Sequence, residues 1–235
     1  EIMANSGPQY RLVYYDVRAL AEPIRWIFSY ASPGIMTPGL KKLKKVLCPI
    51  LVYSFESTVG QIPVLYEKGR KEELSQSHVI SRYLAKKFGL VGDNDWDNAR
   101  EDEVISMVFD LFLFWRTTCF TRIPEQKKIF RGMLDPRVQL YYRKFSEILN
   151  EKPGDFILGT KLSHADFWLA NLVSMLDRPF VGDHPIMAPG MPQPTEDDIY
   201  IGLTAEYPLL KKHMEVVENI PQIKEWIAKR HQTIL

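Results

Sequence analysis

The sequence predicts an α/β half followed by an all-helical half, and three observations support this fold class. The chain opens with Tyr10-Arg-Leu-Val-Tyr-Tyr15, a run of strand-forming residues, and continues with apolar residues at helical spacing over residues 19–30. A second apolar run, Ile62 to Leu65, follows a glycine and precedes another helical pattern. Beyond Gly92 the apolar period is helical almost throughout. We therefore expect an α/β domain over residues 1–91 and an all-helical domain over residues 92–235.

Composition excludes several classes of protein. The 235 residues suffice for one large or two modest domains, and 46% of them are hydrophobic, enough to form a core. Lys and Arg number 30 against 29 Asp and Glu, so no overall positive charge favours nucleic acid. Cys48 and Cys119 form no CxxC, which argues against a zinc or dithiol redox motif. No apolar run reaches the ~18 residues of a membrane-spanning helix, and residues 1–9 lack a signal-peptide core. We expect a cytoplasmic protein without nucleic-acid or membrane partners.

The segment after the first helix is the hardest part of the chain to assign. Ser32-Pro-Gly34 and Pro38-Gly39 interrupt it twice, and we expect breaks in regular structure at both places. Val46 to Phe55 is apolar and fits either a strand or a buried helix. Ile62–Leu65 then pairs with a short strand near Glu73-Leu74, so that the two form a hairpin.

The second half contains several helical patterns separated by turn signals. We expect helices over residues 97–118, 134–150, 167–176, 208–218 and 221–230. Ser163-His-Ala-Asp166 has the spacing of a capping box, in which the serine accepts from an early backbone N–H and the aspartate reaches back. The helix that follows is apolar on all sides and should be central. Residues 178–205 are rich in proline and are expected to form a surface loop.

Two short stretches, Val59–Leu65 and Ser75–His78, together suggest a site for a small extended anion. Pro63 cannot donate to a strand ladder, and an X-Pro bond at this point tolerates the cis form, which would turn backbone groups toward an extended ligand. Serines near residue 76 favour a helix start there, and the N–H groups at a helix N-terminus attract a carboxylate. A plain hairpin leading into a helix is the alternative interpretation.

The order and spacing of several motifs resemble those of cytosolic glutathione transferases. The residues concerned are Tyr10-Arg-Leu-Val-Tyr-Tyr15, Ala21-Glu-Pro-Ile-Arg25, Gly60-Gln-Ile-Pro-Val-Leu65, Gln76-Ser77, Ser81-Arg-Tyr-Leu84, Gly159-Thr-Lys-Leu-Ser-His-Ala-Asp-Phe167 and Ile220-Pro-Gln-Ile-Lys-Glu-Trp-Ile227. The similarity is closest to the sigma class, which includes haematopoietic prostaglandin D synthase and the S-crystallins. It implies a thioredoxin-like domain with a mixed four-stranded sheet, followed by a helical domain that carries a hydrophobic substrate pocket.

The resemblance implies that Tyr14 is the catalytic residue. A free thiol has a pKa of ~8.5, so little glutathione thiolate exists at neutral pH. A phenol O–H directed at the sulfur stabilises the thiolate by a charge-assisted hydrogen bond. Tyr14 and Tyr15 alternate faces of the strand, so only one can serve, and the spacing of the family selects Tyr14.

The resemblance also implies the remaining parts of the site. Gln61, Ile62 and Pro63 would hold the centre of glutathione through backbone contacts, and Gln76 and Ser77 would bind its γ-glutamyl carboxylate. Asp110 falls where the family places an acid that reaches the glutathione of a partner subunit; a solvated helix aspartate is the alternative. The expected walls of the hydrophobic pocket are Val17, Phe112, Trp115 and Leu235. We thus expect a homodimer with glutathione as co-substrate and no metal.

The implied activity is conjugation of glutathione to small hydrophobic electrophiles, a detoxification reaction. A tryptophan and a lysine that the sigma class uses to contact glutathione fall near Ile50 and Ser54, and neither residue is retained. An arginine near the thiol in the prostaglandin synthase aligns with Leu20. Two alternatives remain open. One is a weakly active or inactive protein of the same fold, either crystallin-like or a carrier of hydrophobic ligands. The other is an isomerase of the prostaglandin type.

Overall fold

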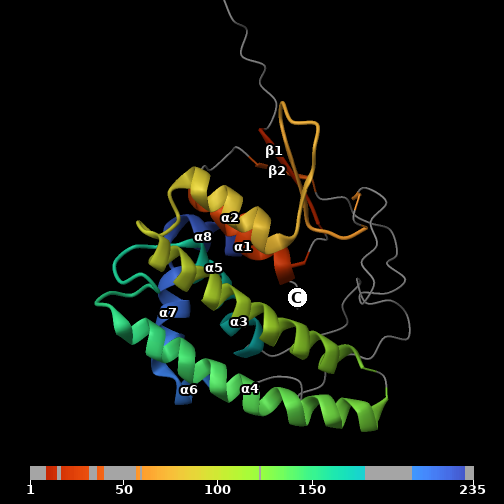
Figure 1. Ribbon diagram of the computed structural model, residues 1–235, viewed down its shortest axis with the longest axis vertical. Helices are drawn as coiled ribbons and strands as arrows, with labels where there is room; N and C mark the ends of the chain where they lie inside the picture. Colours follow the sequence, from red (N-terminus) through yellow and green to blue (C-terminus); the bar gives the residue numbers. More distant parts are fainter. Residues whose placement is uncertain are drawn as a thin grey trace, which may run out of the picture.

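The computed structural model describes residues 9–14, 17–31, 36–39, 57–58, 60–121, 123–177 and 203–230. The described chain forms a small sheet covered by two helices, next to a larger group of helices (Figure 1). The α/β plus all-α fold class expected from the sequence is therefore confirmed. Ile50 and Ser54, the apolar segment 46–55 and most of the proline-rich segment lie outside the described residues.

Four strands form one mixed sheet in the order β2-β1-β3-β4 within the described chain. They are β1 (Tyr10–Val13), β2 (Met36–Gly39), β3 (Val64–Glu67) and β4 (Leu74–Ser75). β1 runs parallel to β2 and antiparallel to β3, and β3 runs antiparallel to β4. β2 corrects the sequence interpretation, which placed a break at Pro38-Gly39. Pro38 has no N–H to donate, but β2 is the edge strand of the described sheet. An edge strand pairs with one neighbouring strand only, so a residue without an N–H is tolerated there.

The helices of the first half pack together against the sheet. They are the short 3₁₀-helix η1 (Ala19–Ala21), α1 (Glu22–Ala31) and α2 (Ser77–Phe88). The Tyr10 ring of β1 lies 5.4 Å from the Phe28 ring of α1 and 6.4 Å from the Phe88 ring of α2, measured between centroids. These aromatic contacts fix both helices on the same face of the sheet.

The second half is helical, as expected. Its helices are α3 (Asp95–Phe120), α4 (Pro124–Glu151), α5 (His164–Asp177), α6 (Leu203–Glu206), α7 (Pro208–Glu218) and α8 (Pro221–Lys229). α4 begins well before the expected start near Leu134 and contains Pro136 in its interior. Pro124 occupies the first turn of α4, where the missing N–H costs nothing. The sequence interpretation did not recognise Pro124 as the start of this helix.

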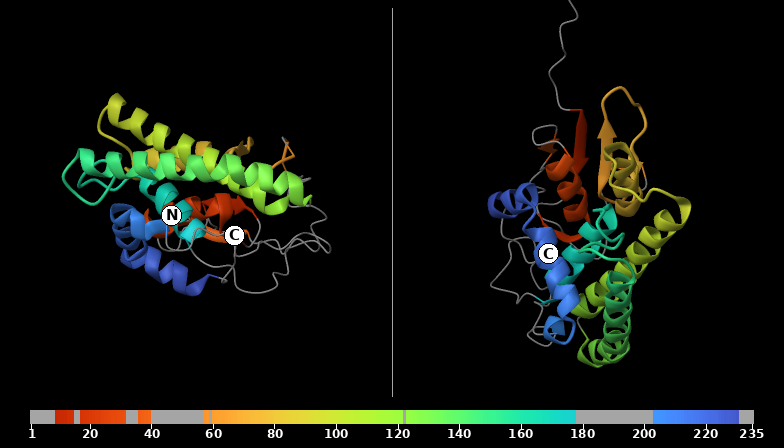
Figure 2. Two further views of the ribbon diagram at one scale, coloured as in Figure 1. Left: turned by 90° about the horizontal axis from the view of Figure 1, so that it is seen from below. Right: turned by 90° about the vertical axis from the view of Figure 1, so that its left-hand side faces the viewer.

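The apolar helix α5 lies at the centre of the molecule. Every residue from His164 to Leu176 is buried. Both views of Figure 2 place α5 between the α3–α4 pair and the α7–α8 pair. On its other side α5 contacts α1, where the rings of Trp26 and Phe167 meet edge to face at 6.1 Å. The predicted central helix is confirmed, whereas the predicted domain boundary after residue 91 stays a prediction.

Glu67, at the end of β3, joins the sheet to α2 through a group of polar contacts. Its carboxylate accepts hydrogen bonds from Tyr83 and Lys87 of α2 and from Arg70 of the hairpin. Burial alone would raise the pKa of Glu67, but these hydrogen bonds outweigh it and lower the pKa from 4.5 to about 2. The ionised carboxylate therefore stabilises the folded protein.

We expect Glu67→Gln to lower the free energy of unfolding at neutral pH. Because the folded-state pKa is depressed, the stabilisation is complete above pH 4.5 and is lost as the pH falls toward 2. Urea unfolding across this range should therefore show the two proteins converging at low pH. Glu72→Gln, at an exposed position of the same hairpin, serves as the control and should match the wild type throughout. A pH-independent difference for Glu67→Gln would contradict the prediction.

Candidate functional site

The sheet register brings three predicted site segments to one end of the sheet. Val13 of β1 pairs with Val64 of β3, and Val64 in turn pairs with Ser75 of β4. Tyr14 follows Val13, Ile62-Pro63 precedes Val64, and Gln76-Ser77 follows Ser75. Since adjacent strands lie about 5 Å apart, these three segments are neighbours at the same end.

The loop before β3 has the features expected from its sequence. The Ile62-Pro63 peptide bond is cis. Ile62 and Pro63 are buried, whereas Gln61 is exposed. The Gln76 side-chain amide donates to Oε1 of Gln61 at 3.4 Å, so the two segments predicted to bind glutathione are in contact.

The start of α2 differs in one respect from the sequence interpretation. The N-cap residue is Gln76 rather than a serine, and its side chain makes no capping hydrogen bond. Gln76 has φ +71°, a left-handed backbone conformation that is costly for a residue with a Cβ. Such conformations concentrate at ligand-binding sites. Ser77 is 3% exposed and opens a helix of 12 residues, whose N-terminal N–H groups favour a carboxylate.

Glu73 anchors the loop that leads into this site, a role that the sequence did not reveal. Its Oε1 accepts from the Thr58 backbone N–H at 2.5 Å and from the Thr58 hydroxyl at 2.7 Å. The Tyr66 hydroxyl donates to Oε2 at 2.9 Å. Burial would raise the pKa of Glu73, but the hydrogen bonds from Thr58 and Tyr66 lower it, so the carboxylate stays ionised. A single acid in a hairpin carries no motif by which to recognise it.

Tyr14, the predicted catalytic residue, is 8% exposed and immediately follows β1. The Arg25 guanidinium of α1 lies over its ring, with Cζ 5.7 Å from the ring centroid. A cation over an aromatic face restrains the ring and adds positive charge near the phenol. The structure thus places Tyr14 next to the loop and helix terminus described above.

An apolar pocket lies between the two halves, formed by η1, α3 and α5. It is lined by Ala19, Leu20, Val108, Phe109, Phe112, Trp168, Asn171, Leu172 and Met175. Of the predicted walls, Phe112 lines it, and Trp115 packs against Phe112 with ring centroids 6.1 Å apart. Val17 is buried and lies two residues before η1, and Leu235 lies outside the described residues. The roles of Val17, Trp115 and Leu235 stay predictions.

Asp110 lies on α3 and is exposed. It accepts a hydrogen bond from the Tyr141 hydroxyl of α4 at 3.0 Å. Burial and this hydrogen bond to the carboxylate raise the pKa of Tyr141, so the phenol keeps its proton. The exposed carboxylate is compatible with the predicted contact to a partner subunit, which stays a prediction.

No described helix combines the length and apolarity needed to cross a membrane. Among the same residues, no group of three or more His, Cys, Asp or Glu side chains could hold a metal ion.

Comparison with known proteins identifies the family. The family model "Glutathione S-transferase, C-terminal domain" matches residues 110–230. A glutathione S-transferase of Anopheles gambiae is 31% identical over 229 residues, covering 95% of this chain and 97% of the relative. Glutathione S-transferase 4 of Caenorhabditis elegans is 27% identical over 239 residues, covering 97% and 100%. Prostaglandin synthase D of Nilaparvata lugens superposes with a TM-score of 0.74 at 26% identity, covering 96% and 100%. The resemblance found in the sequence is thus confirmed, and the chain belongs to the glutathione S-transferase family.

Proposed function

We propose that this chain is a cytoplasmic, homodimeric glutathione transferase that conjugates glutathione to small hydrophobic electrophiles. The observation that carries the proposal is the convergence of Tyr14, Ile62-Pro63 and Gln76-Ser77 at one end of the sheet. The apolar pocket is bounded by η1, which follows the same turn as Tyr14 and supplies Ala19 and Leu20 to its lining. A polar tripeptide site beside an apolar pocket is the arrangement that this reaction requires.

In the proposed mechanism, the backbone at Ile62 and the N-terminus of α2 hold glutathione, and the Tyr14 hydroxyl donates to its sulfur. The thiol proton leaves to solvent, because the hydrogen bond stabilises the thiolate. With a chloronitrobenzene beside the bound glutathione, the sulfur forms a bond to the ring carbon that carries the chlorine, and chloride departs. The protein contributes orientation and a hydrogen-bond donor.

The proposed dimer would form through α3 and α4. These helices expose Leu113, Ile129, Met133 and Leu140, whose relative exposures are 46%, 62%, 52% and 56%. Exposed apolar side chains on adjacent helices favour a protein–protein interface. Asp110 lies on α3 three residues before Leu113 and would reach the partner's glutathione from there. Sedimentation velocity tests the dimer: a monomer at micromolar concentration would contradict it.

Two measurements test the transferase itself. The protein should bind a glutathione affinity column and turn over a chloronitrobenzene substrate. Calorimetry that detects no glutathione binding at millimolar concentration would reject the transferase and favour the carrier or crystallin-like alternative. Prostaglandin isomerisation is a second candidate, favoured by the similarity to prostaglandin synthase D of Nilaparvata lugens. Leu20 argues against it, since this apolar side chain lines the pocket where the resemblance expects an arginine.

Replacing Ser77 with alanine should weaken glutathione binding without impairing the chemical step. A hydrogen bond to a charged carboxylate contributes ~1.5–3 kcal/mol, so the KM for glutathione should rise about tenfold or more. The kcat should change little, because the contact is the same in the ground and transition states. Steady-state kinetics with varied glutathione measure both constants. Ser146→Ala, on α4 away from the site, is the matched control. A lowered kcat with unchanged KM would contradict this role for Ser77.

A further inference from the structure

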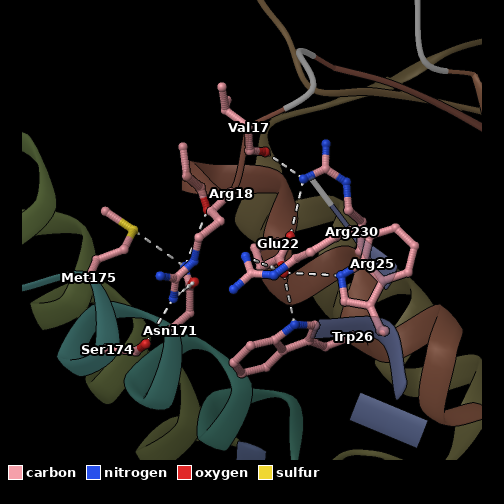
Figure 3. Close-up of polar contacts among 11 residues, drawn as sticks. Val17, Arg18, Glu22, Arg25, Trp26, Asn171, Ser174, Met175 and Arg230 are labelled. Atoms are coloured by element: carbon pink, nitrogen blue, oxygen red, sulfur yellow. Dashed lines mark hydrogen bonds and ion pairs between the residues drawn. The ribbon is translucent and has the colours of Figure 1, made fainter. Parts of the chain in front are cut away.

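A buried carboxylate at the start of α1 joins the two ends of the described chain. Glu22 is 0% exposed, and its Oε1 accepts from the indole N–H groups of Trp26 at 3.1 Å and Trp226 at 3.0 Å. Nη1 of Arg230, at the end of α8, forms an ion pair with Oε1 at 2.9 Å. Oε2 accepts from Nη1 of Arg25 at 3.2 Å, one turn along α1 (Figure 3). Glu22 therefore fixes Arg25 and α8 to the same point.

Arg25 continues this set of contacts to the turn that contains the predicted catalytic residue. Its side chain is 6% exposed. Nη1 donates to the Val17 carbonyl at 2.5 Å, and Cζ lies 5.7 Å from the centroid of the Tyr14 ring. Tyr14 directly follows β1 and Val17 lies two residues before η1, so one guanidinium contacts the chain after β1 and the chain before η1.

The charges in this cluster explain why Arg25 stays in place. A buried guanidinium is costly unless it is paired, and a buried carboxylate that loses its partners is equally costly. Nη1 of Arg25 has two N–H groups, so it can donate to the Glu22 carboxylate and to the Val17 carbonyl, while the guanidinium carbon faces the Tyr14 ring. A lysine keeps the positive charge but lacks the planar guanidinium that faces the Tyr14 ring while one of its nitrogens makes both hydrogen bonds.

We propose that Arg25 is a positioning residue for Tyr14, and that Glu22, bound by α8, holds Arg25 in position. The proposal rests on the proposed transferase function, because Tyr14 must direct its hydroxyl at the glutathione sulfur. Misplacement of a catalytic group by about 1 Å can cost about 100-fold in rate. α8 thus influences the catalytic turn through Trp226 and Arg230, although it belongs to the helical half.

The test compares Arg25→Lys and Glu22→Gln with the wild type. The pH dependence of thiolate absorbance from bound glutathione gives the thiol pKa. We expect Arg25→Lys to raise this pKa toward the value of the free thiol and to lower kcat about tenfold, with the KM for glutathione within about twofold. Glu22→Gln should act in the same direction, and Trp226→Phe, which removes one hydrogen bond to Glu22, should have a smaller effect. Arg70→Lys, with a side chain 60% exposed, is the matched control.

Melting temperatures and a fluorine probe separate positioning from a general structural role. A structural role alone would lower the melting temperature and leave the thiol pKa unchanged, which would overturn the proposal. If Glu22→Gln fails to fold, the thiol pKa values of Arg25→Lys and Trp226→Phe test the positioning role instead. Incorporation of 3-fluorotyrosine gives a fluorine NMR signal for Tyr14, which is assigned by its loss in Tyr14→Phe. In the absence of glutathione, this signal should shift in Arg25→Lys. A wild type that forms no bound thiolate would reject the transferase, while an unmoved fluorine signal would reject the positioning role of Arg25.

Discussion

Tyr14→Phe is expected to lower kcat for conjugation of a chloronitrobenzene by about 100-fold, the usual cost of removing one preorganised donor to a developing or stabilised anion. Phenylalanine keeps the buried ring and its contact with Arg25 but removes the hydroxyl. The KM for glutathione should change little, because the tripeptide is held by the loop before β3 and by the start of α2. The pKa of the bound thiol should rise toward that of free glutathione, which thiolate absorbance measures directly.

Two further tyrosines provide controls for this experiment. Tyr30→Phe removes a hydroxyl from α1 and preserves the ring contact with Phe167 at 6.2 Å, so turnover should match the wild type. Tyr15→Phe tests the choice between the two adjacent tyrosines and should also retain turnover, because the spacing of the family selects Tyr14. Unchanged turnover in Tyr14→Phe would refute the catalytic assignment. Loss of turnover in Tyr15→Phe alone would transfer that role to Tyr15.

The elements that the sequence predicted well are those whose local signals agree with their packing. α7 and α8 each begin at a proline, at Pro208 and Pro221, and the structure starts both helices there. The strand expected at Ile62–Leu65 begins two residues later, at Val64, but it pairs across a Gly-containing turn as expected. Periodicity and turn chemistry act locally, so one sequence suffices to recognise them.

The features that the sequence did not predict depend on contacts between distant segments. β2 contains Pro38, a residue that signals a break unless the strand is known to lie at an edge. α5 is apolar on all sides, so its periodicity could not show that Trp168 and Met175 line the pocket. Gln76 becomes the N-cap because β4 ends at Ser75, not because glutamine favours that position. The sequence alone suggested that the loop before β3 and the start of α2 form one site, whereas the place of Tyr14 beside them could be predicted only through the family resemblance.

Asp166 offers the largest expected effect on stability. Its carboxylate is 0% exposed and accepts from the Ser163 backbone N–H at 2.8 Å, which is the expected backward contact of the capping box. The Ser163 hydroxyl was expected to accept from an early backbone N–H of the helix, and this part of the expectation is wrong. The hydroxyl instead donates to the Asp166 carboxylate at 3.1 Å. The Ile157 N–H donates at 2.8 Å, and Nε2 of His213 on α7 lies 2.9 Å away. One side chain thus joins the start of α5, the preceding loop and α7.

We therefore expect Asp166→Ala to lower the free energy of unfolding by about 3–5 kcal/mol, since it leaves several buried donors without an acceptor. For a protein of this size, the melting temperature should fall by roughly 10 °C. Asp166→Asn keeps one carbonyl acceptor, so its free energy of unfolding should fall by less than that of Asp166→Ala. Asp93→Ala is the control: its side chain is 80% exposed and pairs with Lys161, and a surface ion pair contributes ~0–1 kcal/mol. Urea unfolding of the three variants measures these differences. If Asp166→Ala were no less stable than Asp93→Ala, the hydrogen bonds to Asp166 would not hold α5 and α7 together.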